Sequence, residues 1–158
     1  MVKRRSTDAR RAVLTWAAEE AQRRGDRRLG TDHLLLGLLH HPDAVAARAL
    51  SVDLEAARAA SAELDRAALA AVGIDAGHLS AAPRPVHIRR LPPLTSGARA
   101  VLKRSIEERR PDKSRRIQTR HLVLALLTRE RPDPAAELLA ALGIDPAETR
   151  DRLTDAAD

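Results

Sequence analysis

The six histidines are the residues of this 158-residue chain best suited to acid–base or metal chemistry, but their positions favour a structural role. His33 and His121 each stand two residues after a threonine, at the start of an apolar segment. His40 and His41 end the first of these segments, where a cationic side chain suits the negative end of a helix dipole. We therefore expect hydrogen-bonded structural histidines and no metal site.

Catalytic groups do not occur in a recognisable set. The chain has no cysteine, and no nucleophile, base and orienting group recur together. Its seven glycines never form the GxxxxGK[ST] pattern that cradles nucleotide phosphates. The sequence predicts a protein that is not an enzyme, needs no cofactor and neither binds nor hydrolyses ATP.

Arginine dominates the charged residues. The formal net charge is +6, and all but three of the 28 basic residues are arginine. A basic excess suggests an acidic partner, and the turns at Arg23–Arg28 and Arg115–Arg116 suit nucleic-acid phosphates. No helix-turn-helix pattern or aromatic stacking platform accompanies them, so a nucleic-acid-associated regulator is the alternative rather than the favoured function.

The composition predicts an all-α protein. Apolar residues make up 44% of the chain and are almost entirely Leu, Ala, Val and Ile, with one Trp and no Phe or Tyr. Leucine and alanine favour helices, and aliphatic side chains interdigitate well between helices. The basic N-terminal segment lacks the apolar stretch of a secretion signal, and no run approaches the roughly 18 apolar residues of a membrane span. We expect a cytoplasmic protein with no membrane partner.

The chain contains an internal duplication. A shift of 88 residues lays Thr7–Leu39 on Thr95–Leu127 without a gap, and 15 of the 33 aligned positions are identical. After a short length difference, Ser51–Asp53 aligns with Gly143–Asp145. We expect two tandem repeats, about residues 6–72 and 95–157, in a single domain with pseudo-twofold symmetry.

Each repeat is predicted to form four helices, about eight in all. Their expected starts are Thr7, Thr31, Pro42 and Asp53 in the first copy and Thr95, Thr119, Pro132 or Pro134, and Pro146 in the second. The threonines are expected to cap their helices. The second helix of each copy is apolar on every side, so Leu36 and Leu124 are expected in the core. Residues 73–94, with four prolines, are expected to form an extended linker.

The two copies resemble the Clp N-terminal repeat in Leu29–Leu39 and Val45–Leu50, and again in Thr119–Leu127 and Leu142–Asp145. The resemblance implies an eight-helix, two-repeat domain like that at the front of Hsp100 unfoldases such as ClpA and ClpC, where it binds adaptors and substrates. Because the chain shows no ATPase motif, we expect a stand-alone binding domain, acting as a decoy, a regulator of Clp-dependent proteolysis or a sequestering protein for a toxic peptide.

The resemblance also implies ligand sites. In ClpC-like members each repeat can hold a phosphorylated arginine between the cap threonine of its first helix and a glutamate after the second threonine. Thr7 with Asp32, and Thr95 with Arg120, occupy these positions here. Asp32 keeps the carboxylate and Arg120 reverses the charge, so at most one such site, in the first repeat, is expected. The alternatives are that Asp32 only caps a helix, and that Arg120 is neutral drift or a new anion site.

A groove between the repeats in this family also receives peptides and certain cyclic peptides, usually over a phenylalanine before each cap threonine. Ser6 and Leu94 stand at those positions, and Arg10 replaces a residue that is usually small. Losing both rings removes apolar contact area, so the ligands of relatives need not transfer to this chain. The expected partners are peptides and the clients or adaptors of a Clp system.

Overall fold

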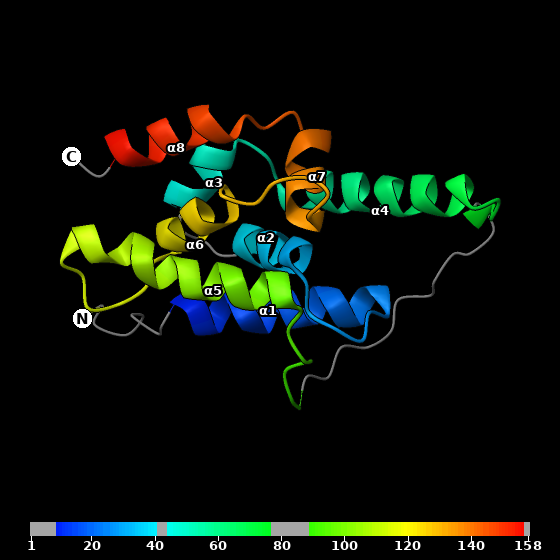
Figure 1. Ribbon diagram of the computed structural model, residues 1–158, viewed down its shortest axis with the longest axis horizontal. Coiled ribbons are helices and arrows are strands. Elements are labelled where there is room, and N and C mark those ends of the chain that lie inside the picture. The colour runs from blue at the N-terminus through cyan, green and yellow to red at the C-terminus, as the bar shows by residue number, and fades with distance from the viewer. Residues whose placement is uncertain (1–8, 41–43, 77–88, 157–158) are drawn as a thin grey trace.

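The computed structural model describes residues 9–40, 44–76 and 89–156, and for residues 44–46 the backbone only. Within these ranges all regular structure is helical, which confirms the all-α prediction (Figure 1). None of the described helices has both the length and the apolar composition to cross a membrane. The elements are α1 Ala9–Arg24, α2 Thr31–His40, α3 Ala44–Leu50, α4 Leu54–Ala71, α5 Ser96–Arg109, the 3-10 turn η2 Arg110–Asp112, α6 Thr119–Leu126, α7 Pro134–Ala141 and α8 Pro146–Asp155.

Four helices begin directly after a side chain that accepts a hydrogen bond from their first turn. Asp53 accepts from Ala56 N at 2.7 Å, and Thr95 accepts from Ala98 N at 3.1 Å. Asp133 and Asp145 cap α7 and α8 in the same way. Each bond satisfies a backbone donor that the helix itself leaves unpaired. The predicted starts near Asp53, Thr95, Pro134 and Pro146 are confirmed, whereas those at Thr7 and Pro42 lie outside the described residues.

The prediction that Thr31 and Thr119 cap the second helices is wrong. Both are the first residues of their helices, and Gln118 holds the cap position of α6. Its backbone N–H donates to Nδ1 of His121, three residues on, so a histidine supplies the return bond that glutamate gives in a capping box. The hydroxyl of buried Thr31 instead donates to Asp133 Oδ1 at 2.7 Å and accepts from Ala135 N, which ties α2 to α7 of the other repeat.

The helix contacts follow the predicted pseudo-twofold symmetry. Helix α1 packs on α2 as α5 packs on α6, and the central helices α2 and α6 touch each other. The outer helices pack across the repeats, because α3 contacts α8 and α4 contacts α7, while α2 contacts α7 and α6 contacts α3 (Figure 1). Each repeat therefore covers apolar surface of the other.

Helix α2 forms the centre of the core. Its residues from Leu34 to Leu38 are all buried. Gly37 permits the close approach of α1, since a Cβ built there would lie 2.6 Å from Val13 O and 2.8 Å from Ala17 N. The equivalent Ala125 in α6 is fully buried with its methyl group. A small residue at this position thus serves helix contact in both copies.

The prediction for Leu124 is wrong. Leu122, Val123 and Leu126 of α6 are buried, but Leu124 is only partly buried against the core. Helix α8 is shorter than α4, with 10 residues against 18, and gives α6 less cover than α4 gives α2. An apolar residue can therefore stand at the edge of the core although its helix is apolar on every side.

The described end of the linker is bound to the first repeat. Leu29 donates its N–H to Pro93 O and accepts from Thr95 N, both at 3.0 Å, in an isolated parallel bridge between Leu29 and Leu94. These bonds fix residues 92–94 beside the turn between α1 and α2. Residues 77–88, which include Pro83 and Pro85, lie outside the described part of the chain.

Burial predicts how leucine truncations rank. Replacing Leu36 by Ala should lower the free energy of unfolding by about 2–5 kcal/mol, because a buried side chain leaves a cavity. Leu122→Ala should cost as much, and Leu124→Ala clearly less. Urea denaturation of the three variants measures this ranking. Equal losses for Leu122→Ala and Leu124→Ala would contradict the placement of Leu124 at the edge of the core.

Candidate functional site

Asp32, the predicted acceptor of a ligand guanidinium, already binds a guanidinium of its own chain. Arg24, the last residue of α1, donates from Nη1 to Asp32 Oδ2 at 2.6 Å and from Nη2 to Asp65 of α4 at 3.0 and 3.1 Å. Burial, the largest influence, would lower the pKa of Arg24, but the surrounding carboxylates outweigh it and raise the pKa above its ordinary value. Asp32 therefore takes part in an ion pair that joins α1 and α2, and it stands in the first turn of α2, where a carboxylate also suits the helix dipole.

The second repeat holds the same ion pair with its charges exchanged. Arg120 Nη2 donates to Asp112 Oδ2 at 2.5 Å. With the shift of 88 residues, Asp112 aligns with Arg24 and Arg120 aligns with Asp32. Arg120 thus keeps the pair with its polarity reversed, which explains its residue type without a new anion site. The sequence alignment contained this signal, but it becomes visible only when positions 24 and 112 are compared together with 32 and 120.

The two buried histidines are structural, as predicted. His33 Nδ1 accepts from Gly30 N at 2.9 Å, so its proton lies on Nε2, which donates to Asp26 Oδ2 at 2.8 Å. His121 repeats the arrangement, with its Nε2 bound to Asp112. In both copies the ring holds the turn before the second helix. Among the described residues no group of three or more potential His, Cys, Asp or Glu ligands is placed to hold a metal ion.

A buried carboxylate joins three helices of the first repeat. Glu20 of α1 is 1% exposed and accepts hydrogen bonds from Arg58 of α4 and from His40 Nε2 of α2, the latter at 2.6 Å. Burial alone would raise the pKa of Glu20, but the hydrogen bonds and charges of Arg58 and His40 outweigh it, so the pKa lies below its ordinary value. Trp16 stacks on His40 with ring centroids 5.9 Å apart and closes this cluster.

The second repeat carries a weaker version of this link. Glu108 aligns with Glu20 and Arg150 aligns with Arg58, and their side chains approach to 3.6 Å. Glu108 also accepts from Arg104 on its own helix at 2.9 Å, and Arg150 donates to the backbone oxygen of Leu124. The carboxylate of Glu108 is therefore shared, whereas Glu20 is held by groups from two other helices.

The remaining residues predicted for ligand binding are not brought together. Ser6 and Thr7 lie outside the described residues. The hydroxyl of Thr95 caps α5, and no hydrogen bond in the described part of the chain joins it to Arg120. Leu94 is half-buried in the bridge to Leu29. Arg10 lines a surface hollow.

The hollow at Arg10 lies between α1 and the end of the linker and has a volume of about 460 Å³. Helix α1 contributes Arg10, Arg11, Leu14 and Thr15, and the linker contributes Arg89, Arg90 and Leu91. Two leucine side chains and four guanidinium groups thus meet at one site. The role of Arg89 and Arg90 could not be predicted from the sequence, because they stand in the proline-rich segment, where no periodic pattern indicates which side chains share a face.

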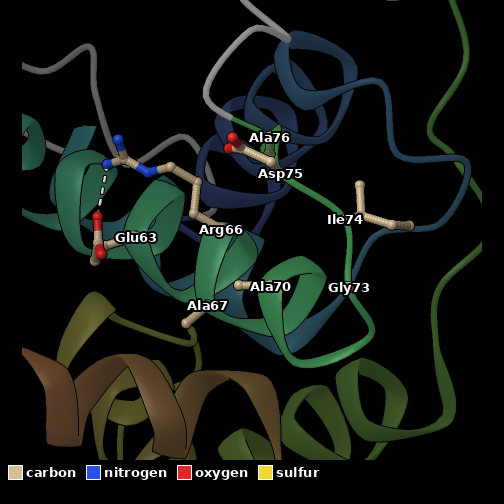
Figure 2. A pocket seen from close by; sticks show the side chains of 8 residues that line it. All are labelled: Glu63, Arg66, Ala67, Ala70, Gly73, Ile74, Asp75 and Ala76. Carbon is tan, nitrogen blue, oxygen red and sulfur yellow. Dashed lines mark ion pairs between the residues drawn. The ribbon is translucent and has the colours of Figure 1, made fainter.

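A second hollow, of about 490 Å³, lies at the free end of α4 (Figure 2). Glu63 and Arg66 point toward each other on one side, with an ion pair of 2.7 Å, and Ile74 lies on the opposite side (Figure 2). Alanine side chains and Gly73 form most of the remaining lining. The charges of Glu63 and Arg66 satisfy each other, and the rest of the described lining consists of apolar groups and the carboxylate of Asp75.

The described part of the chain is a helical domain of two repeats that pack on each other. Comparison with known families identifies it further, since the profile of the Clp repeat (R) N-terminal domain matches residues 5–131. The chain belongs to the Clp N-terminal repeat family, as its sequence signature predicted.

Individual relatives agree with this assignment. ClpC, the ATP-binding subunit of the ATP-dependent Clp protease, is 28% identical over 152 residues in Staphylococcus saprophyticus and 30% identical in Staphylococcus aureus strain USA300. The alignments cover 96% of this chain but only 17% of those proteins. The crystal structure of the N-terminal domain of the chaperone ClpD from Arabidopsis thaliana superposes with a TM-score of 0.68 over 96% of both chains, at 18% identity. This last similarity supports the fold.

The Glu20 cluster predicts acid sensitivity. Since the pKa of Glu20 is lower in the folded chain than its ordinary value of 4.5, its ionised form stabilises the fold above that pH. This contribution is lost as the pH falls below 4.5 and through the folded pKa. At pH 7 Glu20→Gln should cost about 1–3 kcal/mol, because Arg58 and His40 lose a charged acceptor.

Urea denaturation at pH 7 and at about pH 3 measures this effect. The difference between the natural chain and Glu20→Gln should shrink at the lower pH. Glu55→Gln is the matched control, because Glu55 binds the same Arg58 from a position that is 80% exposed and should contribute within about 0.5 kcal/mol. A Glu20→Gln cost that does not change with pH would contradict the lowered pKa.

The phosphoarginine site predicted at Asp32 requires Arg24 to move. We expect free phosphoarginine to bind the Arg24→Gln variant about tenfold more tightly than the natural chain, since a charge-assisted hydrogen bond of about 1.5–3 kcal/mol need no longer be displaced. Fluorescence of Trp16 or calorimetry measures the affinity. The Arg24→Gln, Asp32→Asn double variant should lose this gain. A gain that survives in the double variant would show that Asp32 is not the acceptor.

Proposed function

We propose that this chain is a peptide- and protein-binding domain, which engages adaptors or substrates as the N-terminal domains of Clp unfoldases do, without catalysing a reaction itself. Membership of the family supports the kind of partner. The observation that carries the proposal is the hollow at Arg10, where Leu14 and Leu91 offer apolar contact beside polar and cationic groups. Leu91, a large apolar side chain of this lining, is 46% exposed and is therefore accessible to a partner.

The geometry of the hollow suits an extended or loosely folded peptide better than a small cofactor. Its described lining residues include no carboxylate and no aromatic ring, and one wall is a linker segment fixed by the Leu29 bridge. The hollow therefore presents a fixed surface to a segment of chain laid along α1. Cyclic peptides that depend on stacked rings find none in this lining.

The decoy and sequestration roles are narrower forms of the same proposal. A chain of this kind acting without an attached ATPase ring would compete with an unfoldase for adaptors and clients, in the cytoplasm where those proteins act. Nucleic-acid binding is the alternative from another class, and salt separates the two. Binding to phosphates falls steeply as salt rises, whereas apolar contact hardly changes.

Binding of a permanently unfolded protein tests the proposal. Fluorescein-labelled, reduced and carboxymethylated α-lactalbumin should bind the natural chain with a saturable rise in anisotropy. Leu91→Asn should weaken binding about fivefold or more, because burying a leucine side chain contributes about 1.5–3 kcal/mol. Ile106→Asn on α5 is the matched control, since Ile106 is also large, apolar and 36% exposed. Equal effects of the two substitutions would contradict a site at the hollow.

A further inference from the structure

The hollow at Arg10 continues along α1 as a longer trench. Another hollow, of about 340 Å³ and distinct from the one at the end of α4, lies next to it, and Arg89 and Arg90 line both. We call the hollow at Arg10 the first hollow and this one the second. On α1 the two hollows take in Arg11, Leu14, Ala18 and Gln22, whose spacing of three or four residues places them on one face of the helix. That face spans about 16 Å from Arg11 to Gln22, the length of about five residues of extended peptide.

Unpaired cationic groups line this trench. Arg11, Arg27, Arg89 and Arg90 are exposed, and within the described residues their side chains make no hydrogen bond or ion pair. Other arginines, such as Arg24, Arg58 and Arg129, are bound to carboxylates of the chain. Asp26, the one carboxylate among the described lining residues of the trench, is engaged by His33 and lies 3.3 Å from Arg24. The trench therefore has a surplus of positive charge that the fold itself does not use.

Apolar surface lies between these charges. Leu14 and Leu91 lie in the first hollow, and Ala18 and Pro92 lie in the second. A ligand that matches both features carries carboxylates spaced among apolar side chains. Single-stranded nucleic acid fits less well, because in the part of the chain that the structure describes no aromatic ring lines either hollow to stack on a base, and Trp16 already stacks on His40.

We infer that the trench selects acidic peptide segments bound in an extended conformation, with an apolar side chain between Leu14 and Leu91. The carboxylates of the peptide bind the unpaired arginines Arg11, Arg27, Arg89 and Arg90. This inference rests on the proposed function, since it names the class of peptide that the same site takes. Guanidinium groups suit this role because each presents a planar fork of donors to a carboxylate. Charge selects among peptides here, and apolar contact holds whichever peptide is selected.

Paired peptides test the selection. One peptide of about eight residues places Glu and Leu in turn at every second position, with alanine between them, so that both kinds of side chain lie on one face of the extended chain. Its counterpart carries Gln in place of Glu. Fluorescence anisotropy with the natural chain should show the acidic peptide binding about tenfold more tightly at about 0.05 M salt, with a smaller preference at about 0.3 M. Equal affinity for the two peptides would overturn the inference and leave the proposed function standing, because the neutral peptide would still bind.

Substitutions locate the selection. The Arg89→Gln, Arg90→Gln variant should bind the acidic peptide about tenfold more weakly and the neutral peptide unchanged. Arg110→Gln, Arg115→Gln is the matched control, because it removes the same charge from exposed, unpaired positions outside the trench. Its affinity should stay within about twofold of that of the natural chain. Equal weakening by both variants would overturn the inference, as would tighter binding of a short oligothymidylate than of the acidic peptide.

Discussion

The central helices α2 and α6 must be covered on nearly every side, and the rest of the fold follows from this requirement. A helix that buries Leu34 to Leu38 in succession cannot present a polar face to water. Four short helices of one repeat do not enclose it, so the second repeat supplies the remaining cover through α7. At Gly37 the backbone of α1 lies so close to α2 that a methyl group would not fit between them, and this contact sets how closely the covering helix packs.

Ion pairs then fix the ends of the covering helices. Arg24 and Asp32 hold the end of α1 to the start of α2, and Asp112 and Arg120 do the same in the second repeat with opposite signs. The attraction between the two positions is thus present in both repeats, although the two charges have changed places. One consequence is functional, because a carboxylate already bound to an arginine is a poor acceptor for a second one.

Much of the fold could be predicted from the sequence, because the duplication doubles every signal. The apolar segments at Leu34–Leu39 and Leu122–Leu127 predicted the central helices, and Thr95 predicted a cap that the structure contains. The cap predicted at Thr31 is wrong, because threonine both caps helices and makes buried hydrogen bonds between them, and only the packed structure distinguishes these roles. The core position predicted for Leu124 is wrong, because composition does not reveal how far a neighbouring helix extends.

The candidate site was less predictable than the fold. Arg10 was identified by its position in the family pattern, but Arg89 and Arg90 acquire meaning only when the bridge at Leu29 lays the end of the linker against α1. A site between segments that are distant in sequence leaves no local pattern. Charge pairing is hidden for the same reason, since the partner of Glu20 stands 38 residues away.

Because the outer helices of each repeat pack on those of the other, neither repeat has a complete core by itself. With α3 seated on α8 and α4 seated on α7, a polypeptide cut between residues 76 and 89 would yield two fragments, each lacking the surface that the other provides. Such fragments should recover their structure only by finding each other again. The two fragments could therefore serve as a split reporter of molecular proximity, because the contacts between their helices would hold them together once two fused partners bring them close.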